Sequence, residues 1–131
     1  MNTLIENYDR PVEMPEVFVD DNGIINVDYG SDIVTTAHVV WAVNEHRKID
    51  QTKKMPVMIF VEMATNVEGD MSEIGQTDWV NGVTAALAIV TTTKIANVIG
   101  NIFIKFQKNP YPTKLFHDQN TARRWLQQFK G

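Results

Sequence analysis

The chain has 131 residues, a length typical of one domain that can bury a core without disulfides or structural metals. It contains no cysteine, which excludes disulfide bonds, thiolate catalysis and metal centres held by cysteine. Residues 1–85 carry fifteen acidic side chains against five Lys and Arg, whereas residues 86–131 carry seven Lys and Arg against one Asp. The net charge of −4, without clusters of basic and aromatic residues, argues against nucleic-acid binding.

The N-terminal stretch MNTLIENYDRPVEMP is polar and rich in proline, so we expect a loosely held arm over residues 1–15 and one domain over residues 16–131. No basic segment precedes an apolar core, as it would in a secretory signal. No apolar run approaches the roughly 18 residues that a membrane-spanning helix needs. These features favour a cytoplasmic protein.

Residues 16–29 predict a β-hairpin. Asn22 and Gly23 tolerate positive φ angles, so the pattern predicts a two-residue turn between the strands. Ile25, Val27 and Tyr29 would share one face of the second strand.

Residues 35–49 predict a helix that begins after Thr35, whose hydroxyl can accept a backbone N–H. Ala37, Val40, Trp41 and Asn44 lie at helical spacing, with Val39 and Val43 alongside. The segment Glu45–Lys48 reads as the solvated, cationic end of this helix.

Apolar runs at 55–64 and 87–91 predict two strands covered on both faces, and a fifth strand follows the prolines at 110 and 112. Helices are expected over residues 77–86, either continuing a helix from the preceding loop or restarting after Gly75, over residues 92–108 and from Asp118 onward. The order β-β-α-β-α-β-α-β-α predicts a single α/β domain with a mixed, mostly parallel five-stranded sheet packed with helices.

The helix predicted over residues 92–108 carries a wide apolar stripe. The simplest interpretation is that the stripe covers the sheet. The alternatives are the wall of an apolar ligand pocket, formed by Ile95, Ile99, Ile102, Phe103 and Phe106, or an amphipathic membrane contact, which we consider the weaker one. Hydroxyls and a cation at the start of this helix, Thr92, Thr93 and Lys94, form a candidate anion site.

The stretch VIGNIFIKFQKNPYPTKLFHDQNTARRWL, Val98–Leu126, resembles the C-terminal signature of small bacterial proteins with the SpoIIAA-like fold. These proteins are grouped with STAS domains and with the lipid-transfer CRAL-TRIO fold. The resemblance implies an α/β sandwich that self-associates, as a homodimer in the simplest case. It covers most of the chain.

In the better-known STAS relatives, a Ser or Thr follows an Asp at the start of the helix after the third strand, and its phosphorylation releases a partner. Here Met71 follows Asp70, and this departure argues against such a switch. The resemblance still implies a loop that binds a protein partner. Its candidate residues are Thr65, Asn66, Asp70, Ser72 and Glu73.

Residues that could carry catalysis or bind metal are sparse. His38, His46 and His117 do not have the spacing of a metal site and are expected on the surface or at helix caps. The two serines, Ser31 and Ser72, lie outside nucleophile motifs, and no glycine-rich phosphate loop is present. We therefore expect no metal, cofactor or catalytic residue.

Together these patterns predict a non-enzymatic regulatory or protein-interaction module of SpoIIAA-like, STAS-type fold. The alternative is a carrier of a small apolar ligand or lipid, as the CRAL-TRIO likeness implies. The sequence does not identify the partner, the ligand or the isomer of the Tyr111–Pro112 bond.

Overall fold

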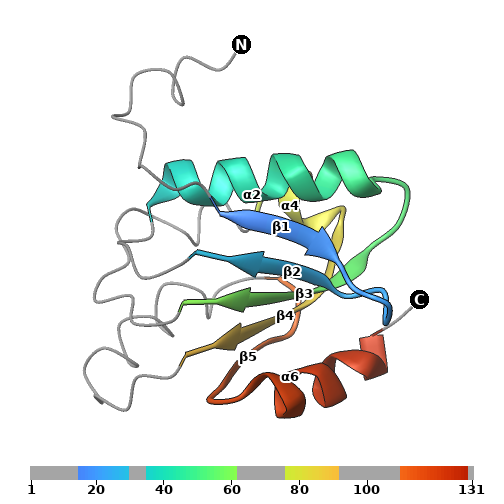
Figure 1. The fold of residues 1–131 in the computed structure, drawn as a ribbon. Helices are drawn as coiled ribbons and strands as arrows, with labels where there is room; N and C mark the ends of the chain where they lie inside the picture. Colours follow the sequence, from blue (N-terminus) through green and yellow to red (C-terminus); the bar gives the residue numbers. More distant parts are fainter. Residues whose placement is uncertain (1–14, 30–34, 62–75, 92–109, 130–131) are drawn as a thin grey trace.

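A computed structural model describes residues 15–29, 35–61, 76–91 and 110–129, which form one α/β unit around a five-stranded sheet (Figure 1). The strands are ordered β1-β2-β3-β4-β5, with β1 and β2 antiparallel and the other neighbours parallel. The predicted mixed, mostly parallel sheet with a leading hairpin is confirmed. The elements are β1 (Glu16–Val19), β2 (Ile25–Asp28), α2 (Thr36–Ile49), β3 (Met55–Phe60), α4 (Asp78–Asn81), β4 (Thr84–Val90), β5 (Thr113–Phe116), α6 (Gln119–Leu126) and the 3-10 helix η1 (Gln127–Phe129).

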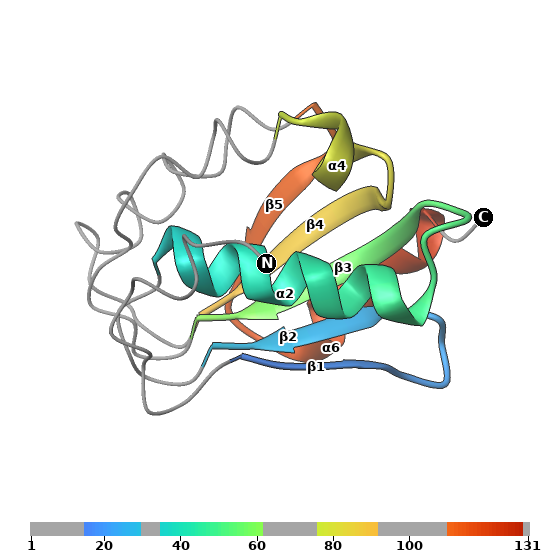
Figure 2. The same cartoon turned by 90° about the horizontal axis from the view of Figure 1, so that it is seen from above.

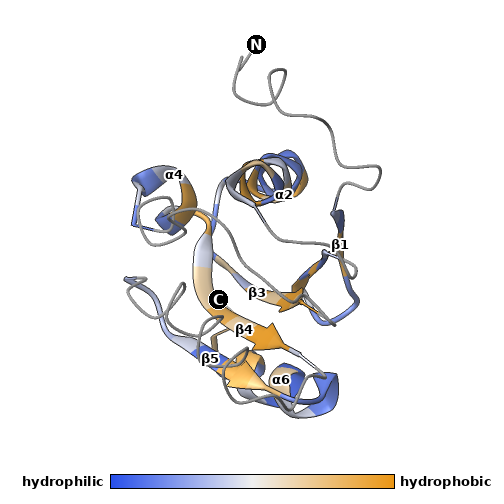
Figure 3. Ribbon diagram, turned by 90° about the vertical axis from the view of Figure 1, so that its left-hand side faces the viewer, coloured by the Kyte–Doolittle hydropathy of each residue, from blue (hydrophilic) through white to orange (hydrophobic). Residues whose placement is uncertain are grey.

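The helices cover the sheet from both sides. Helices α2 and α4 lie on one face, with α2 also packing over β1, and α6 lies on the other face (Figures 1 and 2). Figure 3 shows the central strands β3 and β4 as the most hydrophobic part of this arrangement. They are buried along nearly their whole length, as expected for parallel strands that are covered twice.

Alternation along the strands divides the core into two clusters. The face toward α2 and α4 includes Ile25, Val27, Val57, Ile59, Leu87 and Ile89. The face toward α6 includes Met58, Ala86, Ala88 and Phe116, with Ala122 and Leu126 from the helix. Trp125 closes the edge of this second cluster, its ring 5.5 Å from Phe116 and 4.9 Å from Phe129 between centroids.

The hairpin is present, but its predicted two-residue turn is wrong. The Gly23 N–H donates to the Asp20 carbonyl at 3.0 Å, and the Asp20 N–H donates to the Ile24 carbonyl at 3.0 Å. Three residues therefore form the loop, and Gly23 adopts a φ of 75° at its end. This geometry is the common three-residue hairpin loop, in which a glycine in the left-handed region restores pairing of the strands.

Helix α2 begins as predicted, at Thr35. The Thr35 hydroxyl accepts the His38 N–H at 3.5 Å, and the His38 ring nitrogen Nδ1 accepts the Thr35 N–H at 3.1 Å. This reciprocal pair caps the helix, so the expectation of a capping histidine is confirmed at this position.

The predicted line Ala37, Val40, Trp41 and Asn44 does not coincide with the buried side of α2, since Ala37 alone of these four is buried. Val40 and Trp41 are only half-buried, whereas His38, Ala42 and His46 form the buried line at four-residue intervals. Sequence periodicity favoured the larger apolar residues, but close approach of the helix to the sheet selects the small Ala42 at the centre of this line.

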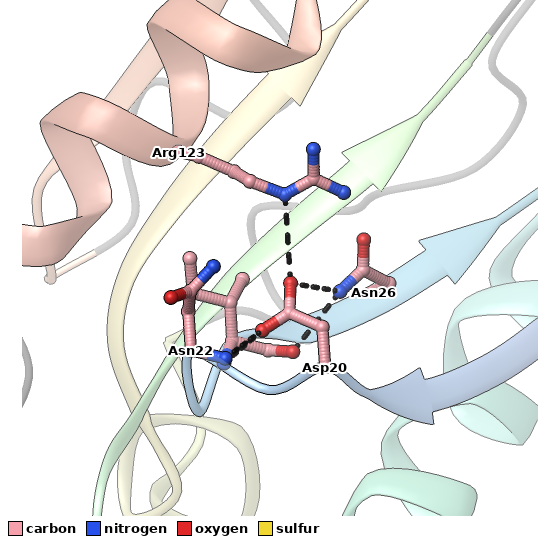
Figure 4. Close-up of polar contacts among 5 residues, drawn as sticks. Asp20, Asn22, Asn26 and Arg123 are labelled. Carbon is pink, nitrogen blue, oxygen red and sulfur yellow. Dashed lines mark hydrogen bonds and ion pairs between the residues drawn. The ribbon is translucent and has the colours of Figure 1, made fainter.

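A polar cluster ties the hairpin to α6 (Figure 4). One carboxylate oxygen of Asp20 accepts the backbone N–H groups of Asn22 and Ile24, at 2.9 and 3.1 Å. The other accepts the Asn26 side-chain amide at 3.0 Å and lies 3.5 Å from Nε of Arg123. Burial by itself would raise the pKa of Asp20, but these hydrogen bonds and the Arg123 charge lower it below its ordinary value.

Within the described residues, no helix is both long and apolar enough to cross a membrane. All peptide bonds in these ranges are trans, including Tyr111–Pro112. The predicted arm over residues 1–15 lies outside the described part of the chain except for Pro15, as do the predicted helix over residues 92–108 and the polar loop that follows β3.

Candidate functional site

A pocket lies between α2, α4 and the sheet. Its free volume is about 60 Å³, and its mouth opens to solvent. The lining side chains come from five elements and from the ends of two strands: Val27, Tyr29, Val39, Ala42, Val43, His46, Val57, Ile59, Val80, Thr84, Leu87 and Tyr111.

The local sequence explains why space remains here. Helix α2 presents a single methyl group, that of Ala42, toward the middle of the sheet, with Val39 and Val43 half-buried beside it. The strands beneath contribute β-branched side chains, which are stiff and cannot extend to fill a gap. The side chains of α2 and of the strands beneath it therefore do not fill the space between helix and sheet completely.

Two tyrosines flank the pocket, Tyr29 just after β2 and Tyr111 just before β5. Both are 8% exposed. Burial raises the pKa of both hydroxyls, and for Tyr29 the neighbouring Tyr111 raises it further. Both side chains therefore remain protonated and neutral at any physiological pH.

His46 is the unusual member of the lining. Its side chain is 3% exposed, and its Nε2 atom is buried without a hydrogen-bond partner among the described residues. Burial, together with repulsion from Arg47, lowers the pKa of His46 to about 4, against a smaller opposing effect of Asp50. The ring is therefore neutral near pH 7, and it carries an unsatisfied polar atom, which is costly in a packed core.

Arg47 connects the two helices that border the pocket. Its guanidinium donates to the Trp79 carbonyl at 2.9 Å and lies 6.0 Å from the centroid of the Trp79 ring. The same group donates to Gln51 at 3.0 Å. These contacts fix α4 against α2, so the pocket has defined walls on both sides.

The histidine predictions had mixed outcomes. His38 caps α2, and His117 is exposed, with its Nδ1 atom 3.3 Å from the Thr91 carbonyl oxygen. His46 was expected on the solvated end of the helix because charged residues surround it, and that prediction is wrong. The four-residue spacing from His38 through Ala42 to His46 was the signal that could have placed it inside.

The residues predicted as sites all lie outside the described residues. This applies to the loop candidates Thr65, Asn66, Asp70, Ser72 and Glu73, and to the anion-site candidates Thr92, Thr93 and Lys94. It applies equally to the predicted ligand wall Ile95, Ile99, Ile102, Phe103 and Phe106. The pocket that the structure does describe has a wall from α2, an element to which the sequence pattern assigned no site.

No group of three or more His, Asp and Glu side chains suited to a metal ion occurs within the four described segments. The described residues that line the pocket include one His, His46, and no Asp or Glu, so they do not form a metal site either.

Comparison with known proteins gives one match. The family model described as "Domain of unknown function (DUF7793)" matches residues 18–130. No curated protein and no solved structure matches the chain.

Proposed function

The chain belongs to the family described as a domain of unknown function (DUF7793), and we propose that it is a non-enzymatic, SpoIIAA-like domain that binds a small apolar molecule between α2, α4 and the sheet. The observation that carries this proposal is the pocket itself, with its mostly aliphatic walls and a few polar groups. Small-molecule sites in proteins have this composition and lie between packed elements.

The chemistry of the walls supports binding over catalysis. General acid–base catalysis uses groups whose pKa values lie near the working pH. Here the pKa of His46 lies at about 4, and the pKa values of Tyr29 and Tyr111 are raised. The hydroxyl of Thr84 donates to the Val80 carbonyl at 2.8 Å, which commits its proton to the backbone. No lining group is thus poised to transfer a proton at neutral pH.

Native mass spectrometry of the protein purified from its own cells tests this proposal. We expect a bound small molecule that leaves on gentle activation, and a bound mass that disappears in Val43→Phe, because this substitution fills the pocket from α2. Val40→Phe is the matched control, since Val40 is a half-buried valine of the same helix outside the lining. Protein that carries no ligand, and does not bind apolar fragments when they are added, would refute the proposal.

A second candidate function is protein interaction through β1, as expected for a STAS-type module. β1 is the last strand at one side of the sheet that the described residues form, and Phe18 and Val19 on it are 45% and 41% exposed. An edge strand with exposed apolar side chains is a template for pairing with another strand. We propose a second copy of the chain as the partner, which would join two sheets into a homodimer.

Light scattering during size-exclusion chromatography tests the homodimer. Phe18→Lys should convert a dimer to a monomer with little change in stability. Ile49→Lys is the control, because Ile49 is 40% exposed but lies at the end of α2. A wild-type protein that is monomeric at high concentration would eliminate this candidate without affecting the ligand-binding proposal.

A further inference from the structure

The pocket lining also specifies the charge of its ligand, an inference that rests on the proposed function. We propose that the pocket between α2, α4 and the sheet accepts an uncharged apolar group and rejects carboxylates, phosphates and ammonium groups. The group that enters the pocket is then neutral, such as a short alkyl chain or an alcohol, and the charged end of a longer molecule would stay outside the mouth. A fatty-acid carboxylate or a lipid headgroup could not enter.

The first support is the composition of the walls. Eight of the twelve lining residues are aliphatic, and the other four are Tyr29, His46, Thr84 and Tyr111. No Asp, Glu, Lys or Arg is among the twelve. A charged group that left water for this pocket would lose its hydration and would meet no opposite charge among the described lining residues.

The second support is that the described charged residues around His46 at the end of α2 are engaged elsewhere. Arg47 donates to Trp79 and Gln51. Lys48 and Glu45 pair with each other at 3.0 Å, and the Asp50 carboxylate accepts the Thr52 hydroxyl at 2.6 Å. None of these groups could turn toward a ligand without giving up its present partner.

The third support is His46, the one lining residue that could become a cation. Its ring is buried between the helix and the sheet, and Nε2 has no acceptor among the described residues that would stabilise a proton. The positive charge of Arg47 lies on the next residue. The imidazole therefore adds a polar but neutral surface and offers no countercharge to an anion.

The free volume limits the size of the buried group. About 60 Å³ is less than the roughly 150 Å³ of an apolar cavity that holds benzene. A short branched alkyl group fits this space, and a longer molecule would extend through the mouth. We therefore choose isobutanol as the neutral probe, with isobutyrate and isobutylammonium as an anion and a cation of nearly the same shape.

Chemical-shift titrations of the isotope-labelled protein at pH 7 test the inference. We expect isobutanol to shift the signals of lining residues such as Val43, Val57 and Leu87 in a saturable manner. Each charged probe should bind at least about tenfold more weakly than isobutanol. Its charge loses hydration in the pocket, and no opposite charge of the lining replaces that interaction. Charged probes that bind as well as isobutanol would overturn this inference and leave the proposed function intact. If none of the three probes binds, the inference fails as well, and if the native protein also carries no ligand, the proposed function fails with it.

A charge-introducing variant provides the converse test. Val43→Lys places an ammonium group at the pocket wall and should raise the affinity for isobutyrate by about tenfold or more. Val40→Lys, on the same helix but outside the lining, should leave that affinity unchanged. Equal effects of both variants would contradict the inference. If Val43→Lys does not fold, the comparison of the three probes on the wild-type protein still tests whether the pocket rejects charged groups.

Discussion

The two faces of the sheet are built from similar residues but packed differently. On the α6 face, Met58, Ala86, Ala88, Ala122 and Leu126 are all fully buried, at 0% exposure. On the face toward α2 and α4, most core residues retain a few per cent of exposure around a pocket. The same central strands contribute to both faces, so the difference arises from the helices.

The helices differ in what they present to the sheet. Helix α6 directs Ala122 and Leu126 into the core, and Trp125 and Phe129 close its edge. Helix α2 directs Ala42 inward with the polar ring of His46 after it. A small residue followed by an imidazole cannot seal a sheet surface as leucine does, because neither supplies enough apolar volume. One face is thus densely packed, and the other retains a pocket.

The largest expected effect compares two leucines, one on each face. Leu126→Ala removes a fully buried side chain from the packed face and should lower the free energy of unfolding by about 2–5 kcal/mol. Leu87→Ala should cost less, near the lower end of that range, because it enlarges a space that solvent already reaches. Urea denaturation of both variants gives the comparison. Equal losses would show that the two faces are packed alike.

The next effect is a dependence of stability on pH that belongs to the pocket face. His46 has a pKa of about 4 in the folded chain and an ordinary value of 6.5 when unfolded. Between these values the unfolded chain binds more protons, so stability is complete above pH 6.5 and falls as the pH drops toward 4. The difference corresponds to about 3 kcal/mol.

Substitution of His46 tests this effect. In His46→Leu that part of the acid sensitivity should vanish, and stability at pH 5 should exceed that of the wild-type protein. His117→Leu, at an exposed position, is the control and should keep the wild-type slope. Thermal unfolding measured between pH 4.5 and 8 reports the slopes. If the stability of His46→Leu depends on pH as steeply as that of the wild-type protein, groups other than His46 cause the acid sensitivity.

A smaller effect comes from filling space on each face with one added side chain. Ala122→Val and Ala42→Val carry the same intrinsic helix cost, and both alanines are buried. Ala122→Val should lower stability by about 1–3 kcal/mol through overpacking, whereas Ala42→Val should cost less than about 1 kcal/mol because the pocket receives the added methyl groups. Calorimetry of the pair measures this. A larger loss at Ala42 would mean that the pocket is not available to a side chain.

The smallest effect concerns the polar cluster that joins the hairpin to α6. Asp20→Asn removes the charge near Arg123 and weakens the hydrogen bonds of the turn, so we expect a loss of about 1 kcal/mol at pH 7. Because the folded-state pKa of Asp20 is depressed, its contribution is present above the ordinary value of 3.8 and is lost as the pH falls below it. Asp21→Asn, at the exposed neighbouring position, should change nothing measurable in the same denaturation experiment.

The sequence by itself determined the types of the elements and their order wherever the structure describes them. The predicted boundary before β4 is wrong, because the strand begins at Thr84 and α4 ends at Asn81. Alternating apolar residues predicted the strands of the hairpin, and continuous apolar runs predicted β3 and β4. The capping residues Thr35 and Asp118 marked the starts of α2 and α6. All of these signals are local in the sequence. The length of the hairpin loop, with Gly23 at φ 75°, depended on backbone pairing that an Asn-Gly motif does not fix.

Only the tertiary structure decided which side of α2 faces the sheet and, with it, the pocket. Periodicity placed His46 among charged neighbours on the solvated end of the helix, but docking of the helix through Ala42 turned this ring inward beside Tyr29 and Tyr111. The tyrosines are far apart in the sequence and line one pocket because β2 and β5 belong to one sheet. A binding surface made from separate elements depends on their packing, which no single segment of sequence encodes.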